Sequence, residues 1–222
     1  MRRSQLRRSP GPGPTFGRGL RVLLLLGLLS GGGCGGGDTT TQPGPEPSYA
    51  ERIAAGWTAF EAGNFDPARS QFLAAVAADP APLEGWMGLG WTELRRSDPD
   101  AAHDAFESGS DKNGSDAQRA DLLAGWAFGW SARSTQAGRF SESNARIDEV
   151  ETLTSTWSFA HAPGLDADDL VLLAAENHFA LGAFAASLAR VQVLDPAFTA
   201  DIGTPAGQAA LAAKIEALRV GP

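Results

Sequence analysis

The sequence predicts an all-α protein of stacked helical hairpins, and three observations support that prediction. The first is a recurrence of identical residues 34 positions apart, a period typical of two-helix repeats. The recurring pairs are Gly56 and Gly90, Trp57 and Trp91, Ala68 and Ala102, and Phe72 and Phe106. The second is the helical spacing of apolar residues later in the chain, and the third is the crowding of proline and glycine before residue 49. The repeats are therefore expected over residues 49–222.

One motif connects these repeats to a known family. Trp86-x-x-Leu89-Gly90 is followed by Ala102-x-x-x-Phe106, and this arrangement resembles the signature of tetratricopeptide repeats. The resemblance implies a right-handed solenoid of about four hairpins with a C-terminal capping helix. In such a stack, small residues let helices cross closely while aromatic rings fill the space beside them. The expected packing residues are Gly56, Ala68, Phe72, Trp86, Leu89, Gly90, Ala102 and Phe106.

The first two hairpins have clear boundaries in the sequence. The first is expected from residue 49 to residue 80, with Gly63 ending its first helix. The second is expected from residue 83 to residue 109, with Asp98 capping its second helix and Pro99 beginning it. A longer polar loop follows.

The third hairpin departs from the repeat. Gly125-Trp126 keeps the glycine-tryptophan step, but the turn glycine expected at Ala132 appears only at Gly138. This displacement predicts a first helix that is extended by six residues. The second helix is expected to end near residue 154.

A long connection over residues 155–165 leads to a fourth hairpin and a final helix. Acidic residues at positions 166–169 favour a helix N-terminus, and we interpret this cluster as helix capping rather than as a metal site. The hairpin ends at Asp195-Pro196, with a second helix about one turn short. Thr204-Pro205 then begins a helix whose polar side suits the end of an open stack.

The front end, residues 1–33, predicts a targeting segment. Arginines precede an apolar run at 22–29, which is shorter than the roughly 20 residues of a membrane-spanning helix but suits a secretory signal. Small residues immediately before Cys34, the only cysteine, resemble a bacterial lipoprotein signal. That resemblance implies cleavage before Cys34 and lipid attachment to it. An ordinary secretory signal with an incidental cysteine, or an uncleaved anchor, remains an alternative.

Residues 34–48 predict a flexible tether between the lipid and the repeats. This segment is rich in glycine, threonine and proline and lacks apolar periodicity, and its reach is about 20 Å. Gly35 stands where lipoproteins retained in the inner membrane of well-studied Gram-negative systems carry Asp. By this resemblance we expect the outer membrane, facing the periplasm.

The charge of the repeat region is strongly acidic. The formal net charge of the chain is −8, and six arginines lie in the first 34 residues, which contain no acid. Residues 35–222 therefore carry 12 basic and 26 acidic residues, a balance of −14. Nucleic acids and anionic lipid surfaces bind clustered lysine and arginine, so the composition argues against both as general partners.

The sequence indicates no catalytic or metal-binding site. His103, His161 and His178 lie in different repeats without the spacing of a known catalytic or zinc motif. Gly88-Leu89-Gly90 lacks the third glycine and the preceding strand of a dinucleotide loop. We therefore expect no enzymatic activity, no cofactor and no bound metal.

The tryptophans are the most distinctive candidates for function. Trp57 and Trp91 fall at the family position that lines the groove of a tetratricopeptide stack. The resemblance implies a partner-binding groove formed by Ile53, Trp57, Phe60, Met87, Trp91 and Leu94. These side chains are apolar, which favours an apolar peptide or helix over a terminal carboxylate. The alternative is that the tryptophans only pack between helices, an alternative favoured for Trp86 and Trp126.

Two functions remain for the structure to distinguish. The first is an envelope-anchored protein-protein interaction adaptor or scaffold that binds a protein or peptide. The second is a carrier that encloses a small apolar ligand or lipid in an aromatic concavity. A pocket enclosed by Trp57, Trp91, Trp126 and Trp130 would favour the carrier.

Overall fold

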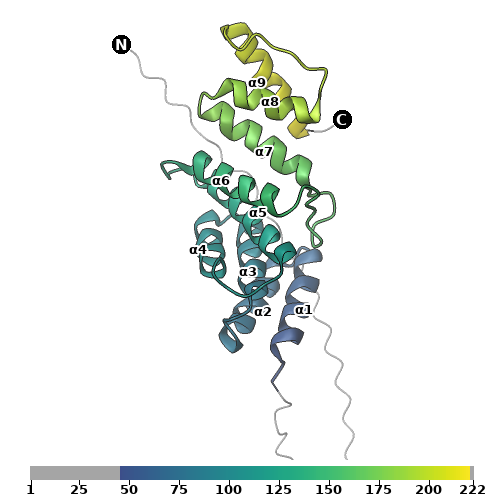
Figure 1. Ribbon diagram of the computed structural model, residues 1–222. Helices are drawn as coiled ribbons and strands as arrows, with labels where there is room; N and C mark the ends of the chain where they lie inside the picture. Colours follow the sequence, from purple (N-terminus) through teal and green to yellow (C-terminus); the bar gives the residue numbers. More distant parts are fainter. Residues whose placement is uncertain (1–45, 221–222) are drawn as a thin grey trace, which may run out of the picture. The chain divides into compact units, whose positions relative to one another are not determined.

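The computed structural model describes residues 46–220, and within that range the chain forms nine α-helices and no strand beyond isolated bridges (Figure 1). The all-α class predicted from the sequence is confirmed. The helices are α1 (Tyr49–Glu61), α2 (Phe65–Ala78), α3 (Leu83–Arg95), α4 (Pro99–Gly109), α5 (Asp116–Ala132), α6 (Arg139–Leu153), α7 (Ala167–Ala180), α8 (Phe184–Leu194) and α9 (Pro205–Val220).

Neighbouring helices pair into four hairpins, as predicted. Within the described residues, α1 packs on α2, α3 on α4, α5 on α6, and α7 on α8. The first helix of each hairpin also contacts the first helix of the next, so that α1, α3, α5 and α7 form a continuous row. The final helix, α9, packs on α7 and α8 and ends the stack.

Capping groups fix where several helices begin. Ser48 and Glu51 form a capping box at the start of α1, which satisfies two backbone N–H groups that the helix leaves unpaired. At α4, Asp98 accepts a hydrogen bond from the Ala101 N–H at 3.0 Å and Pro99 is the first helical residue, as predicted. The predicted acidic cap of α7 is also present, because Asp166 and Asp169 form a capping box.

Phenylalanines that fit against glycines hold the first three hairpins in register. A β-carbon at Gly56 would lie 2.7 Å from the Phe72 ring, and one at Gly88 would lie 2.4 Å from the same ring. Phe106 repeats the arrangement with Gly90 and Gly125, at 2.4 and 2.5 Å. Because real carbon atoms do not approach so closely, each ring requires both glycines. The remaining predicted packing residues also lie in or against the core: Ala68, Trp86, Leu89 and Ala102.

Where α5, α6 and α7 meet, a buried network of polar side chains joins the helices in place of the phenylalanine and glycine contacts. Asn177 on α7 donates to the Ser143 hydroxyl at 2.8 Å and to the Asn144 side-chain oxygen at 3.0 Å, both on α6. Ser131 on α5 donates to the Asn177 oxygen at 3.1 Å, and Ser143 donates to the Ala127 carbonyl at 2.8 Å. Asn177 and Ser143 are fully buried, so these hydrogen bonds satisfy groups that water does not reach.

The predicted extension of the third hairpin's first helix is wrong. Helix α5 ends at Ala132, close to where an ordinary repeat would turn, and the extra residues form a loop at 133–138. The other three hairpins turn within the three residues 62–64, 96–98 or 181–183. Gly138 lies in the left-handed region, with φ 77°, and begins α6 rather than ending α5.

The stack contains two apolar cores. The larger core runs through α1 to α7, and the smaller one joins α7, α8 and α9 around Val191, Leu211 and Ile215. At the start of α9, the Gly207 N–H donates to the Thr204 hydroxyl at 3.1 Å, as the predicted cap requires. The predicted signal peptide, most of the tether and Cys34 lie outside the described residues.

Candidate partner-binding face

The six residues of the predicted groove lie together on the face formed by α1, α3 and α5, which we call the α1–α3–α5 face. Ile53, Trp57 and Phe60 come from α1, and Met87 and Trp91 come from α3. All five side chains are buried, and Leu94 on α3 is partly buried against the same core. The face is therefore not an open groove, and the six residues lie in or against one apolar core.

The chain itself covers this face. The connection between α6 and α7 carries Phe159, whose ring stacks on Trp91 with centroids 4.3 Å apart and lies edge-on to Trp57 at 6.0 Å. His161 stacks flat on Trp57, with ring centroids 3.7 Å apart and an interplanar angle of 1°. Trp57 and Trp91 also lie edge-on to Phe72 and Phe106 of their own hairpins.

The covering residues, Trp157–His161, alternate between the face and solvent, and we call them the inserted segment. Trp157 and Phe159 are buried, with 4% and 2% of their surface exposed, whereas Ser158 and Ala160 are exposed. A period of two is typical of an extended peptide lying in a groove. The segment thus occupies the face as a bound peptide would, although it belongs to the same chain.

Side-chain hydrogen bonds fasten the inserted segment at both ends. The Trp157 indole N–H donates to the Asp121 carboxylate on α5 at 2.8 Å, and His161 lies 2.8 Å from the Glu61 carboxylate at the end of α1. The backbone hydrogen bonds of the segment are made within its own connection, such as that from the Phe159 N–H to the Leu165 carbonyl at 2.9 Å. Aromatic stacking and side-chain hydrogen bonds, rather than backbone hydrogen bonds to the helices, therefore hold the segment in place.

Asp121 is the ionisable group most affected by the covered face. Burial raises its pKa to about 6 from the ordinary 3.8, while the hydrogen bond from Trp157 and the nearby His161 act in the opposite direction. The Trp91 indole N–H also donates to the Asp121 backbone carbonyl at 3.0 Å. Asp121 thus joins the inserted segment and the face at one point.

The other tryptophans belong to a different part of the stack. Trp126 donates to His103 Nδ1 at 2.8 Å, and Trp130 lies edge-on to the same imidazole at 4.5 Å. Trp86 is partly buried against the core and donates to the Pro80 carbonyl at 3.0 Å, which agrees with a packing role. The four tryptophans of the carrier hypothesis therefore separate into two groups, with Trp57 and Trp91 on Phe159 and the other two on His103.

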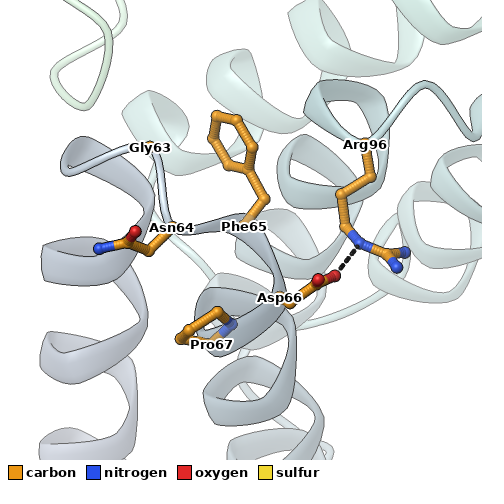
Figure 2. Close-up of a pocket in the computed structure, with 6 residues that line it drawn as sticks. All are labelled: Gly63, Asn64, Phe65, Asp66, Pro67 and Arg96. Atoms are coloured by element: carbon orange, nitrogen blue, oxygen red, sulfur yellow. Dashed lines mark hydrogen bonds and ion pairs between the residues drawn. The ribbon is translucent and has the colours of Figure 1, made fainter. Parts of the chain in front are cut away.

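A shallow polar pocket of about 500 Å³ lies at the tip of the first hairpin, lined by residues 63–67 and Arg96. Figure 2 shows the Arg96 guanidinium directed at the Asp66 carboxylate, a contact of 2.9 Å. Arg96 also pairs with the buried Glu93 at 2.7 Å, and Arg69 pairs with Glu93 as well. These charges neutralise one another and link α2 to α3, so the pocket has little free charge to bind a ligand.

The histidines occupy satisfied positions in the fold. Burial lowers the pKa of His103, which accepts from Trp126, and the pKa of His178, which lies 3.3 Å from the Asn144 side chain. Over residues 46–220 no three histidine, cysteine, aspartate or glutamate side chains are grouped as metal ligands. Across that same range no helix combines the length and the apolar character that crossing a membrane requires.

Comparison with known proteins agrees with this geometry. Residues 53–117 match the tetratricopeptide repeat family. The chain has a tetratricopeptide-repeat fold. The matched residues cover α1 to α4, where the phenylalanine and glycine contacts recur, whereas the stacked hairpins continue to α8. A search of curated proteins finds no match.

A solved structure shares the tetratricopeptide arrangement over most of the stack. It is the crystal structure of the APC/C hetero-tetramer Cut9-Hcn1, with a TM-score of 0.56 and 9% sequence identity. The match covers 76% of this chain and 29% of that one, so this chain spans less than a third of the length of the solved protein. At this identity the similarity shows the fold alone.

The residues that cover the face were not predicted from the sequence. Trp157, Phe159 and His161 lie in what was predicted only as a long connection, and Asp121 was not singled out. The alternation of rings with small residues from position 157 to 161 was the available signal. Its target could not be read from the sequence, because Glu61 and His161 are 100 positions apart.

Proposed function

We propose that this protein is a non-catalytic adaptor that binds another protein and is held in a bacterial cell envelope by lipid on Cys34. The tetratricopeptide-repeat fold is the observation that carries the adaptor function, since stacked hairpins present a long face made of many side chains. The solved structure with the same fold is part of a hetero-tetramer, which supports assembly with other chains as the role of such a stack.

The sequence supports the rest of the proposal. A short apolar run followed by small residues and the only cysteine favours export and lipid attachment, and Gly35 favours the outer membrane facing the periplasm. The balance of −14 over residues 35–222 favours a protein partner over nucleic acid. The aromatic character of the α1–α3–α5 face favours an apolar segment of that partner.

Affinity capture tests this proposal. The full-length protein with a C-terminal tag would be expressed in a Gram-negative host of known envelope physiology, solubilised from membranes and compared with Cys34→Ala. We expect Cys34→Ala to leave the membrane fraction, and the wild-type protein to recover a partner protein in fixed stoichiometry. Recovery of co-extracted lipid without any protein would favour the carrier instead and overturn the adaptor function.

A further inference from the structure

The inserted segment lies on the face in the manner of a ligand. Its three rings meet Trp57, Trp91 and the α5 residue Asp121, while the intervening residues Ser158 and Ala160 face solvent. An ordinary connection between two helices has no need to bury alternate aromatic side chains between other helices.

The surroundings of the segment leave room for it to move. Two pockets, of about 310 and 260 Å³, border Trp157 and both include Thr154 at the end of α6. Pro163 and Gly164 are exposed at the turn that returns the chain to α7, and Gly164 has φ 90°. The connection can therefore change course at both ends without disturbing the hydrogen bonds inside α6 or α7.

We propose that the inserted segment is a displaceable internal ligand of the α1–α3–α5 face. The partner would bind by placing there an extended segment of its own with rings at alternate positions. The partner's first and second rings would replace Trp157 and Phe159, and a third ring or a histidine would stack on Trp57 next to the Glu61 carboxylate. This inference deepens, and rests on, the adaptor function proposed above.

A tethered ligand competes strongly with a free one, because the tether gives it a high effective concentration. Any partner therefore binds with an apparent affinity reduced by the fraction of molecules in which the face is uncovered. Weakening the internal segment raises that fraction, so it is expected to strengthen the binding of an external segment. This expectation separates a ligand from a structural part of the core, whose loss would weaken binding.

The probe for the test is a fluorescent peptide with the sequence of residues 154–164, titrated into the full-length protein and followed by anisotropy. We expect weak binding to the wild-type protein, at least about tenfold tighter binding to Phe159→Ala, and severalfold tighter binding to His161→Ala. Ala160→Ser is the matched control, since residue 160 is exposed on the same segment, and it should behave as wild type. A control peptide with alanine at the three ring positions should not bind.

Phe159→Ala removes a buried ring, so circular dichroism must show that its helices remain formed. The milder His161→Ala, whose side chain is partly exposed, keeps the test informative if Phe159→Ala unfolds.

Equal affinities for wild type and His161→Ala, or equal binding of the ringless peptide, would overturn the inference. So would a concentration-dependent dimer of the wild-type protein, because the occupant would then be a second copy. The anchored protein could capture a partner even though the peptide titration shows no gain in affinity for the variants. That combination would contradict this inference but leave the proposed adaptor function standing.

Discussion

The first two hairpins and the junction of α5, α6 and α7 hold neighbouring helices together by different means. Phe72 in the first hairpin fits between glycines of α1 and α3, and Phe106 in the second fits between glycines of α3 and α5. At the junction, the buried Asn177 hydrogen-bonds to side chains of α5 and α6. Both arrangements produce the same row of stacked hairpins.

The difference explains where the family resemblance ends. A ring fitted between glycines requires particular residues at particular positions, so it leaves a repeated sequence pattern over residues 53–117. A hydrogen-bond network can be built from many combinations of serine and asparagine, so it leaves no such pattern. The fold therefore extends further along the chain than its recognisable sequence does.

Removing a ring from the first type of contact is expected to have the largest effect. Phe106→Ala should lower the free energy of unfolding by about 3–5 kcal/mol, because it deletes a fully buried ring and leaves a cavity. Urea denaturation followed by circular dichroism measures the change. A loss below 1 kcal/mol would show that the ring does not hold the helices in register.

Removing the centre of the polar network is expected to cost less. Asn177→Ala should lower the free energy of unfolding by about 2–3 kcal/mol, since it removes the donor to the Asn144 side-chain oxygen and to the buried Ser143 hydroxyl, which keeps only its bond to the Ala127 carbonyl. Ser131→Ala, which removes one contact at the edge of the network, should cost about 1 kcal/mol or less. Equal losses in the two variants, measured by the same denaturation, would contradict a network centred on Asn177.

Two glycines in α5 provide a matched pair for the steric contact. Gly125→Ala should cost about 1–3 kcal/mol, because the new methyl group would lie 2.5 Å from the Phe106 ring. Gly129→Ala should raise the free energy of unfolding by up to about 1 kcal/mol through helix propensity, since the nearest side chain to the new methyl group, Leu94, would be 3.7 Å away. If both substitutions have the same sign in thermal unfolding, the close contact with Phe106 is not what selects glycine.

Asp121 is expected to give the smallest effect and a dependence on pH. Its pKa is raised to about 6 in the folded protein from an ordinary 3.8, so its contribution to stability is fully present below pH 3.8 and is lost as the pH rises through about 6. Asn does not titrate, so Asp121→Asn does not lose stability as the pH rises, and its side-chain oxygen still accepts the hydrogen bond from Trp157. The variant should therefore gain about 1 kcal/mol more over wild type at pH 7.5 than at pH 5, after allowance for solvent screening.

Denaturation of wild type and Asp121→Asn at both pH values measures that difference. Burial also raises the pKa values of Asp169 and Glu176, but these carboxylates are present in both proteins, so their effects cancel in the comparison. If the stability of Asp121→Asn relative to wild type, measured as free energy of unfolding, falls as the pH rises, the raised pKa of Asp121 is contradicted.

The sequence predicted the parts of the fold that depend on local residues or on exact repetition. The cap at Asp98, the start of α9 and the equivalent surroundings of Gly56 and Gly90 are confirmed. The end of α5 was wrong because Gly138 was taken as a turn residue, whereas it precedes α6. The end of a helix depends on tertiary contacts as well as on the next glycine.

The candidate site was predicted only in part, for a physical reason. Positions on α1 and α3 follow from the repeat, and in the structure Trp57 and Trp91 both contact Phe159. The cover over them is a contact between distant parts of the chain, and no local pattern specifies where a connection will dock. In the structure, Phe159 and His161 of the same chain contact Trp57 and Trp91, two of the predicted groove residues.

Hydrogen exchange on the wild-type full-length protein, followed by mass spectrometry, tests the central claim most directly. If the inserted segment opens while the stack stays folded, the Phe159 amide, which is hydrogen-bonded to the Leu165 carbonyl, will exchange well before the interior amides of α1, α3 and α5. A saturating external segment with alternate rings should speed exchange of the Phe159 amide further. If the Phe159 amide instead exchanges only together with those helices, the segment is a fixed part of the core and the account is contradicted.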